Sequence, residues 1–368
     1  MPEFSAADHA FMARALQLAA RGRYTAHPNP TVGCVLVHGD AVVGEGWHQL
    51  AGEAHAEINA LAVAGENSRG ARAYVTLEPC AHHGKTPPCT TALIDAGIAE
   101  VIVALEDPNP RVNGRGLQQL ADAGVRVRSG LLQDAVARQL EGFVSRIVRG
   151  RPFVRLKLAA SLDGCIAMKN GESQWITGTD ARADVQRLRA GSGAIMTGIG
   201  TVLADDPSLT VRDASIDMRG RQPLRVVLDS RLRMPLSAEM LALPGTTLVY
   251  CHDDAKRNLL VDAGAEVTRV AGDGDAVDLA AVFDDLASRD INAVLVEAGP
   301  ALAGSLVEQD LVDELVIYQA PQIMGSETMR LFRTPTWTSL ADRRNLQIMD
   351  MRRVGDDMRI TARWQDKD

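Results

Sequence analysis

The chain has 368 residues, of which 46% are hydrophobic, so its length and composition fit two domains with a hydrophobic core in each. The formal net charge of −8, the lack of a basic stripe with interspersed aromatics and the lack of an 18-residue apolar run argue against a nucleic-acid partner and against a membrane span. Five cysteines, an odd number, and an N-terminus without a secretory signal favour a cytoplasmic protein.

Helices and strands alternate through the first part of the chain, which predicts an α/β layer structure. In order, we expect a helix over 6–22, strands over 34–37 and 41–43 turned at Gly39-Asp40, a helix over 54–64, a strand over 73–77, a helix over 90–96, a strand over 101–105, a helix over 116–123, a strand over 125–127 and a helix over 132–147.

The pattern His55-Ala56-Glu57, followed by Cys80 and then Cys89, carries the strongest chemical signal in the chain. Zinc prefers nitrogen and sulfur ligands, and three protein ligands leave a fourth position open for water. The carboxylate of Glu57 is not needed as a ligand, so it can carry a proton from water to a leaving amine. These residues together predict a zinc-dependent deaminase site.

The two cysteines are nine positions apart, rather than three as in the usual form of this signature. The longer gap requires a loop, which Gly84, Pro87 and Pro88 would form. His82 and His83 lie in this loop and are competing ligand candidates. The alternative interpretation is a purely structural zinc site, in which one of these histidines fills the fourth position and Glu57 has no role.

A polar Gly/Pro-containing stretch, Arg149–Pro152, is the expected domain boundary and gives domains 1–148 and 149–368. Beyond it we expect strands and helices to alternate again, with a polar loop over 212–221. The expected strands cover 153–158, 194–197, 225–228, 246–250, 266–270, 293–296, 314–318 and 359–364, and the expected helices cover 179–190, 279–288 and 301–309.

Two glycine turns in the second domain follow expected strands, one over 198–207 and one over 296–305. Helix N-termini after such turns suit phosphate groups, and together the turns favour a nucleotide cofactor. Lys157 is expected at the end of a strand, where a lysine is usually only solvated. Glu297 is expected to emerge from a buried strand end, where open α/β sheets place ligand contacts. Trp175 can cover a flat ring or pack in a core.

At this point the chain resembles a known family, the bifunctional deaminase/reductases of riboflavin biosynthesis. The motifs that carry the resemblance span both halves of the chain and include the long gap between the cysteines. They are Pro28–Gly33, His55–Glu57, Thr76–Cys89, Asp107–Pro110, Lys157–Gly164, Glu172–Thr177, Leu203–Pro207 and Glu297–Ser305.

The resemblance implies an N-terminal cytidine-deaminase-like α/β/α domain and a C-terminal dihydrofolate-reductase-like α/β domain. The first domain would deaminate a phosphoribosylamino-pyrimidine, and the second would reduce the ribosyl group to a ribityl chain with NADPH. The expected partners are this phosphorylated small molecule and further copies of the chain in a dimer or tetramer. A tRNA or nucleoside deaminase with an accessory domain is the rival enzyme class.

The resemblance also implies roles for residues at matching positions. The zinc ligands would be His55, Cys80 and Cys89, with Glu57 as the proton carrier. The deaminase substrate contacts would be Asn29, His48, Lys85 and Asn109. The reductase substrate contacts would be Ser173, Arg189, Leu209, Arg212 and Glu297, with Lys157 and Glu297 beside the sugar. The NADPH contacts would be Ala159, Trp175, Thr201, Asp205, Ser230, Gly299, Pro300, Ala301, Leu302, Ala303, Gly304 and Ser305.

Overall fold

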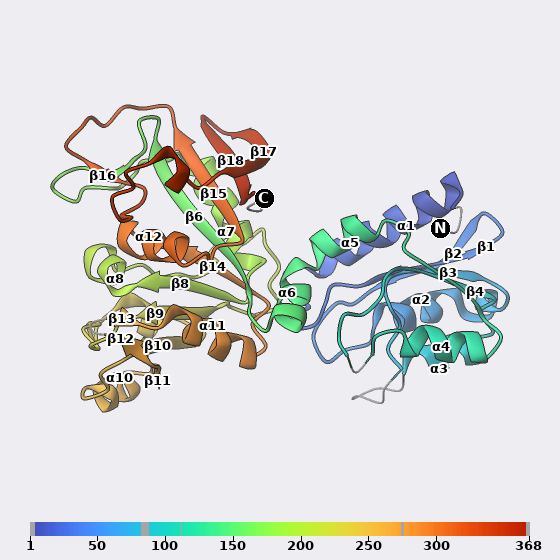
Figure 1. The fold of residues 1–368 in the computed structure, drawn as a ribbon. Coiled ribbons are helices and arrows are strands. Elements are labelled where there is room, and N and C mark those ends of the chain that lie inside the picture. Colours follow the sequence, from blue (N-terminus) through green and yellow to red (C-terminus); the bar gives the residue numbers. More distant parts are fainter. Residues whose placement is uncertain (1–3, 82–87, 111, 274–275, 366–368) are drawn as a thin grey trace. The chain divides into compact units, whose positions relative to one another are not determined.

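A computed structural model describes residues 4–81, 88–110, 112–273 and 276–365 (Figure 1). The chain forms two compact units, Met1–Gly150 and Arg151–Asp368. The division falls within the polar stretch Arg149–Pro152, two residues after the boundary expected from the sequence. Within the described ranges, no helix is both long and apolar enough to cross a bilayer.

The first unit is built on a five-stranded sheet with the order β2-β1-β3-β4-β5. The central pair β3/β4 and the pair β4/β5 are parallel, whereas β1 runs antiparallel to both of its neighbours. The strands are β1 (Gly33–His38), β2 (Ala41–Trp47), β3 (Arg72–Leu77), β4 (Glu100–Leu105) and β5 (Arg126–Ser129).

Helices cover both faces of this sheet and give three α/β/α layers, as Figure 1 shows and as the resemblance implied. One face packs against α1 (Ala6–Ala19), α5 (Gln133–Gln139) and α6 (Glu141–Arg149). The other face packs against α2 (Ala56–Ala64), α3 (Cys89–Asp95) and α4 (Arg115–Asp122). Short 3₁₀ turns, η1 (Ala20–Gly22) and η2 (Gly65–Ser68), follow α1 and α2.

Helix α2 lies unusually close to strand β2, because two glycines on β2 leave room for its backbone. A Cβ atom at Gly46 would come within 2.3 Å of the Ala56 carbonyl oxygen, and one at Gly44 within 2.3 Å of the Ala60 carbonyl oxygen. Side chains at these positions would push the helix away. The start of α2, which carries His55 and Glu57, is therefore fixed against the sheet.

The second unit is built on a nine-stranded sheet with the order β11-β10-β9-β8-β14-β6-β15-β18-β17. The strands from β11 to β15 are parallel, and β18 and β17 add an antiparallel edge. The strands are β6 (Phe153–Ser161), β8 (Ala194–Gly198), β9 (Leu224–Leu228), β10 (Thr247–Cys251), β11 (Glu266–Arg269), β14 (Ala293–Glu297), β15 (Glu314–Ala320), β17 (Leu346–Val354) and β18 (Asp357–Trp364).

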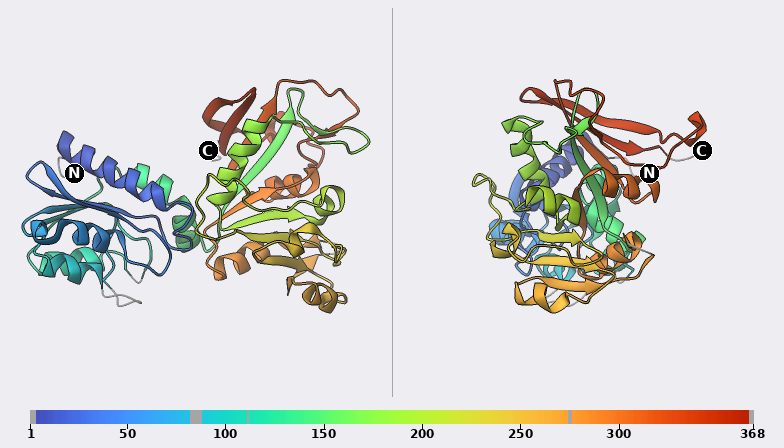
Figure 2. Two further views of the ribbon diagram at one scale, coloured as in Figure 1. Left: turned by 180° about the vertical axis from the view of Figure 1, so that it is seen from behind. Right: turned by 90° about the vertical axis from the view of Figure 1, so that its left-hand side faces the viewer.

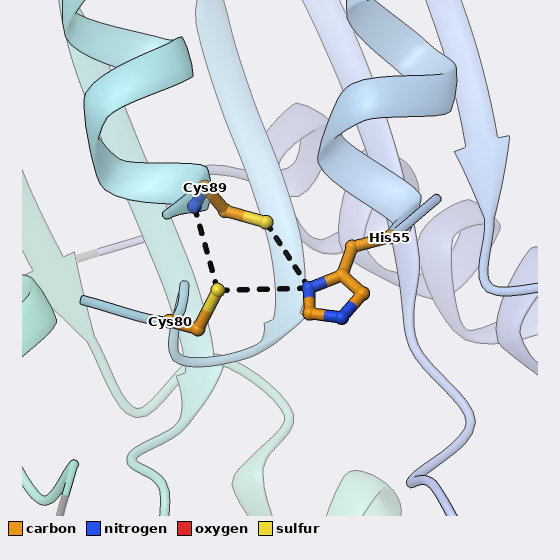
Figure 3. Close-up of side chains that lie close together, drawn as sticks. All are labelled: His55, Cys80 and Cys89. Atoms are coloured by element: carbon orange, nitrogen blue, oxygen red, sulfur yellow. Dashed lines mark hydrogen bonds between the residues drawn. The ribbon is translucent and has the colours of Figure 1, made fainter. Parts of the chain in front are cut away.

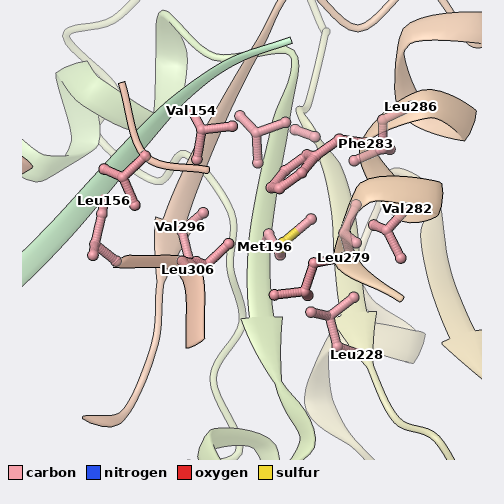
Figure 4. Close-up of a cluster of buried hydrophobic side chains, with 14 of the residues drawn as sticks. Val154, Leu156, Met196, Leu228, Leu279, Val282, Phe283, Leu286, Val296 and Leu306 are labelled. Carbon is pink, nitrogen blue, oxygen red and sulfur yellow. The ribbon is translucent and has the colours of Figure 1, made fainter. Parts of the chain in front are cut away.

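Helices again cover both faces of the sheet, as the views in Figures 1 and 2 show. On one face of the sheet, α11 (Leu279–Ser288) and α12 (Pro300–Glu308) pack to form the larger core (Figure 4). The other face packs α7 (Thr179–Ala190), α8 (Ile199–Asp205), α9 (Glu239–Ala242) and α10 (Arg257–Asp262). The minor elements are β7 (Cys165–Ala167), β12 (Gly272–Asp273), β13 (Ala276–Val277), β16 (Met329–Arg330) and η3 (Leu340–Asp342).

Three expectations about local structure were wrong, and several elements were not expected. Lys157 lies in the middle of β6, not at its end, because pairing with β15 extends the strand to Ser161. The glycine turn over 198–207 contains helix α8, which begins directly after Gly198. The helix expected over 132–147 is two helices divided at Leu140. Strand β17, an exposed edge strand, was not expected at all.

Candidate active sites

His55, Cys80 and Cys89 converge in the first unit from three different elements (Figure 3). His55 is the N-cap residue of α2, Cys80 follows β3, and Cys89 begins α3. The Nδ1 atom of His55 lies 3.2 Å from Sγ of Cys89 and 3.6 Å from Sγ of Cys80. Their ligand atoms all lie within 4.8 Å of one another.

These separations fit a zinc ion. Tetrahedral zinc with ordinary Zn–N and Zn–S bonds places nitrogen and sulfur ligands about 3.6 Å apart. Hydrogen bonds from Cys89 and His55 hold the pKa of the Cys80 thiol well below its usual range, so this sulfur is readily a thiolate ligand. The competing candidates His82 and His83, and the loop residues Gly84 and Pro87, lie outside the described residues.

Glu57 lies in the first turn of α2, two residues after His55, and only 3% of its surface is exposed. Burial raises the pKa of its carboxyl to about 7, against the opposing influence of His55. A carboxyl with a pKa near neutrality can both accept and release a proton. Glu57 is therefore a buried carboxyl two residues from the candidate ligand His55, with a pKa close to neutrality.

Two of the expected substrate contacts, Asn29 and His48, form a hydrogen-bonded chain beside the metal site. The Asn29 amide donates to Nε2 of His48 at 3.0 Å, and Nδ1 of His48 donates to the Ala54 carbonyl at 3.1 Å. The His48 ring meets the His55 ring edge to face at 5.5 Å. Burial lowers the pKa of His48, which favours the neutral ring that this hydrogen-bond arrangement requires. Asn109 follows the neighbouring strand end of β4, and Lys85 lies outside the described residues.

In the second unit, the expected ligand contacts lie along one edge of the sheet. The parallel strands β9, β8, β14 and β6 are neighbours, and their carboxyl ends meet at this edge. Ser230, Thr201 and Gly299 follow β9, β8 and β14, and Ala159 lies two residues before the end of β6. Ligands of open α/β sheets bind at this kind of edge.

Lys157 and Glu297 are direct partners in the β6/β14 ladder, so their side chains lie side by side on the face covered by α7. Arg189, near the end of α7, donates two hydrogen bonds to the Glu297 carboxylate, at 2.6 Å from Nε and 2.9 Å from Nη2. Its Nη1 atom donates to the Thr210 carbonyl at 3.0 Å. Most of the donors of Arg189 are thus bound within the protein.

Opposite charges in this group stabilise the ionised form of Glu297. Burial alone would raise the pKa of its carboxyl, but Arg189, Lys157 and Arg212 together hold it below its usual range. Burial lowers the pKa of the Lys157 ammonium. The negative charge of Glu297 opposes this shift, and the positive charge of Arg189 adds to it. The Nζ atom of Lys157 also lies 5.9 Å from the centroid of the Tyr318 ring.

The turn at the start of α12 offers main-chain donors at the same sheet edge. Pro300 is in the first turn, and Gly299 precedes it in an extended conformation. A Cβ at Gly299 would lie 3.9 Å from Oγ1 of Thr201, and one at Gly198 would lie 3.7 Å from Leu302, so the two glycine turns are neighbours. The amides of Ala301 and Leu302 belong to the helix start.

Ala303 and Gly304, which the resemblance placed at the NADPH site, are buried in the packing of α12. A Cβ at Gly304 would lie 2.0 Å from the Arg333 carbonyl oxygen. This glycine therefore allows the segment at Arg333 to approach, and an aspartate there would disrupt packing before it repelled any phosphate. Ser305 is half-buried in the second turn of the helix.

The remaining expected residues differ in accessibility. Trp175 is 68% exposed, with the Arg182 guanidinium 4.6 Å from its ring. Leu209 is 2% exposed and packs in the core below α8, so it offers a ligand little more than its backbone. Arg212 and Asp205 are exposed, and Ser173 is half-buried. Arg212 donates to Oγ of Ser208 at 2.5 Å.

Sequence patterns did not indicate two further polar residues at these sites. Thr197 follows Met196, the ladder partner of Val296, so it lies in the same row as Glu297 and Lys157. Its buried hydroxyl has no partner among the described residues. Glu78 lies between β3 and Cys80 and is buried. Only the strand register could have identified the first, and the position directly before Pro79-Cys80 was the available signal for the second.

Comparisons with known proteins cover both units. Residues 5–105 match the cytidine and deoxycytidylate deaminase zinc-binding region, and residues 152–360 match the RibD C-terminal domain. The riboflavin biosynthesis protein RibD of Escherichia coli (strain K12) is 47% identical, over 95% of this chain and 98% of its own length. The protein of the same name from Haemophilus influenzae is 46% identical over 98% of each chain.

Two solved structures also match the whole chain. RibD of Acinetobacter baumannii, form 1, has a TM-score of 0.92 and 42% identity, covering 98% of this chain and 99% of that one. The diaminohydroxyphosphoribosylaminopyrimidine deaminase/5-amino-6-(5-phosphoribosylamino)uracil reductase of Thermotoga maritima has a TM-score of 0.85 and 31% identity, with the same coverage. The chain therefore belongs to the RibD family of bifunctional deaminase/reductases of riboflavin biosynthesis.

Proposed function

We propose that His55, Cys80 and Cys89 hold one Zn²⁺ ion and that Glu57 carries the proton in hydrolytic deamination of 2,5-diamino-6-(5-phosphoribosylamino)pyrimidin-4-one. The convergence of the three ligand atoms is the observation that carries this proposal. Bound zinc would acidify water and leave one position open for it. Glu57 would take a proton from the water oxygen and deliver it to the departing amine, which leaves as ammonia.

The substrate contacts of the deaminase are part of the same proposal. The Asn29–His48 pair is fixed beside His55, so its remaining polar atoms suit recognition of the pyrimidine ring. Asn109 lies on the neighbouring strand end and would add a second amide contact. Lys85 would meet the phosphate, since an ammonium group pairs well with an anion of this kind.

For the second unit we propose NADPH-dependent reduction of the deaminated product to 5-amino-6-(5-phosphoribitylamino)uracil. Bound NADPH would supply the hydride for the sugar carbon once the ring has opened to an imine. Glu297, held ionised by Arg189, would accept hydrogen bonds from the sugar hydroxyls. Lys157, whose pKa is lowered, would donate a proton to the ring oxygen as the ring opens.

The NADPH contacts in this proposal are limited to groups that the fold leaves available. They are the amides at the start of α12 around Gly299, the hydroxyl of Thr201 and the exposed ring of Trp175, with Ala159, Asp205 and Ser230 at the edges. Helix N-termini and the carboxyl edge of a parallel sheet suit a phosphate-bearing cofactor. Arg212 and Ser173 would contact the phosphorylated sugar.

One experiment tests both activities. The purified, zinc-loaded protein is incubated with the diaminopyrimidine substrate, with and without NADPH, and the products are identified by mass. We expect the deaminated product alone without NADPH and the ribityl product with it. Lys157→Ala should slow the second step and leave the first unchanged. A ribityl product that forms at the normal rate in this variant would disprove the role of Lys157.

We also propose that the chain is a homo-oligomer that associates through strand β17. This strand is the last in the sheet, and it exposes Leu346, Ile348, Met349 and Met351 by 37%, 59%, 47% and 60%. An apolar edge strand of this kind readily pairs with another copy. Sedimentation equilibrium should find a dimer or larger assembly, and Ile348→Lys with Met351→Lys should convert it to monomers. A wild-type monomer at micromolar concentration would contradict the proposal.

None of the five cysteines forms a disulfide, and four of them are buried. Free thiols persist in a reducing compartment, so we place the protein in the cytoplasm.

A further inference from the structure

Glu78, which has no role in the reaction described above, joins two strand ends beside the metal site. It follows β3 and precedes Cys80 by two residues, and its side chain is almost fully buried at 4% exposed. Three backbone N–H groups donate to its carboxylate: Gly116 at 2.8 Å, Gly114 at 2.9 Å and Asp107 at 3.1 Å. All three come from the segment that runs from the end of β4 into α4.

This carboxylate replaces a cap that helix α4 lacks. The N-cap residue of α4 is Gly114, which has no side chain to bind the free N–H groups of the first turn. Glu78 accepts from two of those positions and brings a negative charge to the positive end of the helix. A Cβ at Gly116 would lie 2.2 Å from the Pro79 carbonyl oxygen, so the start of α4 lies directly against the residue before Cys80.

The same segment carries Asn109. The Asp107 carboxylate accepts from the Asn109 N–H at 2.8 Å, while the Asp107 N–H donates to Glu78. The Asn109 carbonyl accepts from the N–H groups of Val112 at 2.8 Å and Asn113 at 3.0 Å. A continuous chain of hydrogen bonds therefore runs from Glu78 through Asp107 to the turn that holds Asn109.

We propose that Glu78 is a positioning residue for substrate recognition in the deaminase, because it holds Asn109 in place relative to the metal site. This inference rests on the proposed contact between Asn109 and the pyrimidine substrate. Glu78 is buried and its carboxylate faces backbone donors, so it acts through Asp107 and Asn109 rather than on the substrate itself. Loss of its charge should weaken substrate binding more than the chemical step.

The zinc ligands have a separate support, so substrate binding can be tested without loss of metal. The Thr90 N–H donates to the Cys80 carbonyl at 3.3 Å, and the Cys89 N–H donates to Sγ of Cys80 at 3.4 Å. Thr90 is fully buried at the start of α3, next to Cys89. These contacts do not involve Glu78, so a conservative change at Glu78 should leave Cys80 and Cys89 in place.

The test uses the full-length, zinc-loaded protein. Glu78→Gln keeps the shape but turns one acceptor into a donor that faces N–H groups, so we expect KM for deamination to rise about tenfold or more, with kcat changed by about twofold at most. Zinc content and the reductase rate should stay normal. Glu100→Gln is the matched control, because Glu100 is a buried carboxylate at the opposite end of β4 that pairs with Arg128.

A double-mutant cycle shows whether the effect passes through Asn109. Asn109→Ala should raise KM by itself. Adding Glu78→Gln to this variant should raise KM little further, because both changes remove the same contact between Asn109 and the substrate. Effects of the two changes that multiply fully, or an unchanged KM in Glu78→Gln, would overturn the proposal. An unchanged KM in Asn109→Ala would refute the substrate contact itself and this inference with it. If Glu78→Gln does not fold, Asp107→Ala breaks the next link and must give the same rise in KM.

Discussion

Each of the two sites contains a glutamate that is largely shielded from solvent, but the pKa values of the two carboxyls are shifted in opposite directions. The pKa of Glu57 is raised to about 7 by burial, and the described groups that act on it are His55, Cys80 and Cys89. The pKa of Glu297 is lowered despite burial, because Arg189 and Lys157 surround it. Such divergence separates groups that transfer protons from groups that supply a fixed charge. In the proposed mechanism, zinc would supply the positive charge of the first site, whereas Arg189 and Lys157 supply it in the second.

The largest expected effect comes from removing the source of charge in the first site. Cys80→Ser should lose both the zinc and the deaminase activity, down to background, because a serine hydroxyl is a poor zinc ligand. Elemental analysis and a deaminase assay on the same preparation measure both. Cys34→Ala, which removes a buried cysteine outside the ligand set, should retain the metal. A fully zinc-loaded Cys80→Ser protein would refute the ligand assignment.

The second largest effect is expected from replacing Glu57, the proposed proton carrier. Glu57→Gln should keep the zinc and lose deamination by about 10³-fold or more, since the amide cannot carry a proton. Reduction of a substrate that is already deaminated should continue at the wild-type rate, because the two units have separate cores. Deamination at a near-normal rate would rule out Glu57 as the proton carrier. Loss of reduction would mean that the two sites are not independent.

The next prediction tests whether Arg189 keeps Glu297 ionised. Arg189→Gln leaves a buried carboxylate without its bidentate partner, at a cost of about 3–5 kcal/mol for the ionised form. The pKa of Glu297 should therefore rise, and reduction should slow about 10²-fold at neutral pH. In Arg189→Gln, kcat/KM for reduction should fall further as the pH drops below neutrality, because Glu297 takes up a proton. In the wild type, kcat/KM should stay constant over the same pH range.

Arg289→Gln serves as the control for this experiment, since Arg289 pairs with Asp285 away from the sheet edge. The pH profile separates an electrostatic role of Arg189 from a loss of folding. A protein that is only destabilised would have lower activity, but its kcat/KM would not acquire a new pH dependence. An acid limb that is identical in wild type and Arg189→Gln would show that Arg189 does not control the ionisation of Glu297.

The smallest effect concerns a carboxylate outside both sites. Asp8 is 3% exposed, and hydrogen bonds from Tyr74, Ser5 and Arg128 outweigh burial and lower its pKa from 3.8 to about 2. A lowered pKa in the folded state stabilises the protein above pH 3.8, and this contribution is lost as the pH falls toward 2. Asp8→Asn should therefore cost about 2 kcal/mol at neutral pH and much less near pH 2. Calorimetry at both values measures the difference, and an equal cost at both would contradict it.

The deaminase site was readable from the sequence because its residues lie in short motifs. His55 and Glu57 share one turn. Cys80 follows the end of a strand and Cys89 stands at the start of a helix, and the hydrophobic pattern locates both elements. The close approach of α2 to β2 could not be predicted from the sequence. Gly44 and Gly46 make room for a helix that is separated from them in the chain, and no local pattern indicates this contact. Glu78 was missed for the same reason, because its partners follow a different strand.

The reductase site depends on strand register, which the sequence does not encode locally. Lys157 appeared to end a strand, because Ala159, Ala160 and Ser161 have weak strand preferences. The pairing with β15 extends the strand, and the β6/β14 register then places Lys157 beside Glu297. The contribution of Arg189 comes from a helix packed on that face. Resemblance to a family identified these residues, but only the register explains how they act together.

The ladder between β6 and β14 also sets an order of events during synthesis. The described deaminase contacts end at Asn109, whereas the reductase site needs Glu297, which pairs with Lys157 from a strand made much earlier. Ribosomes add roughly 5–20 residues per second, so Glu297 is made at least roughly 7 s after the first unit ends at Gly150. Until then β6 lacks both of its neighbours in the sheet, β14 and β15. The first unit can therefore fold while the second still lacks two strands of its sheet.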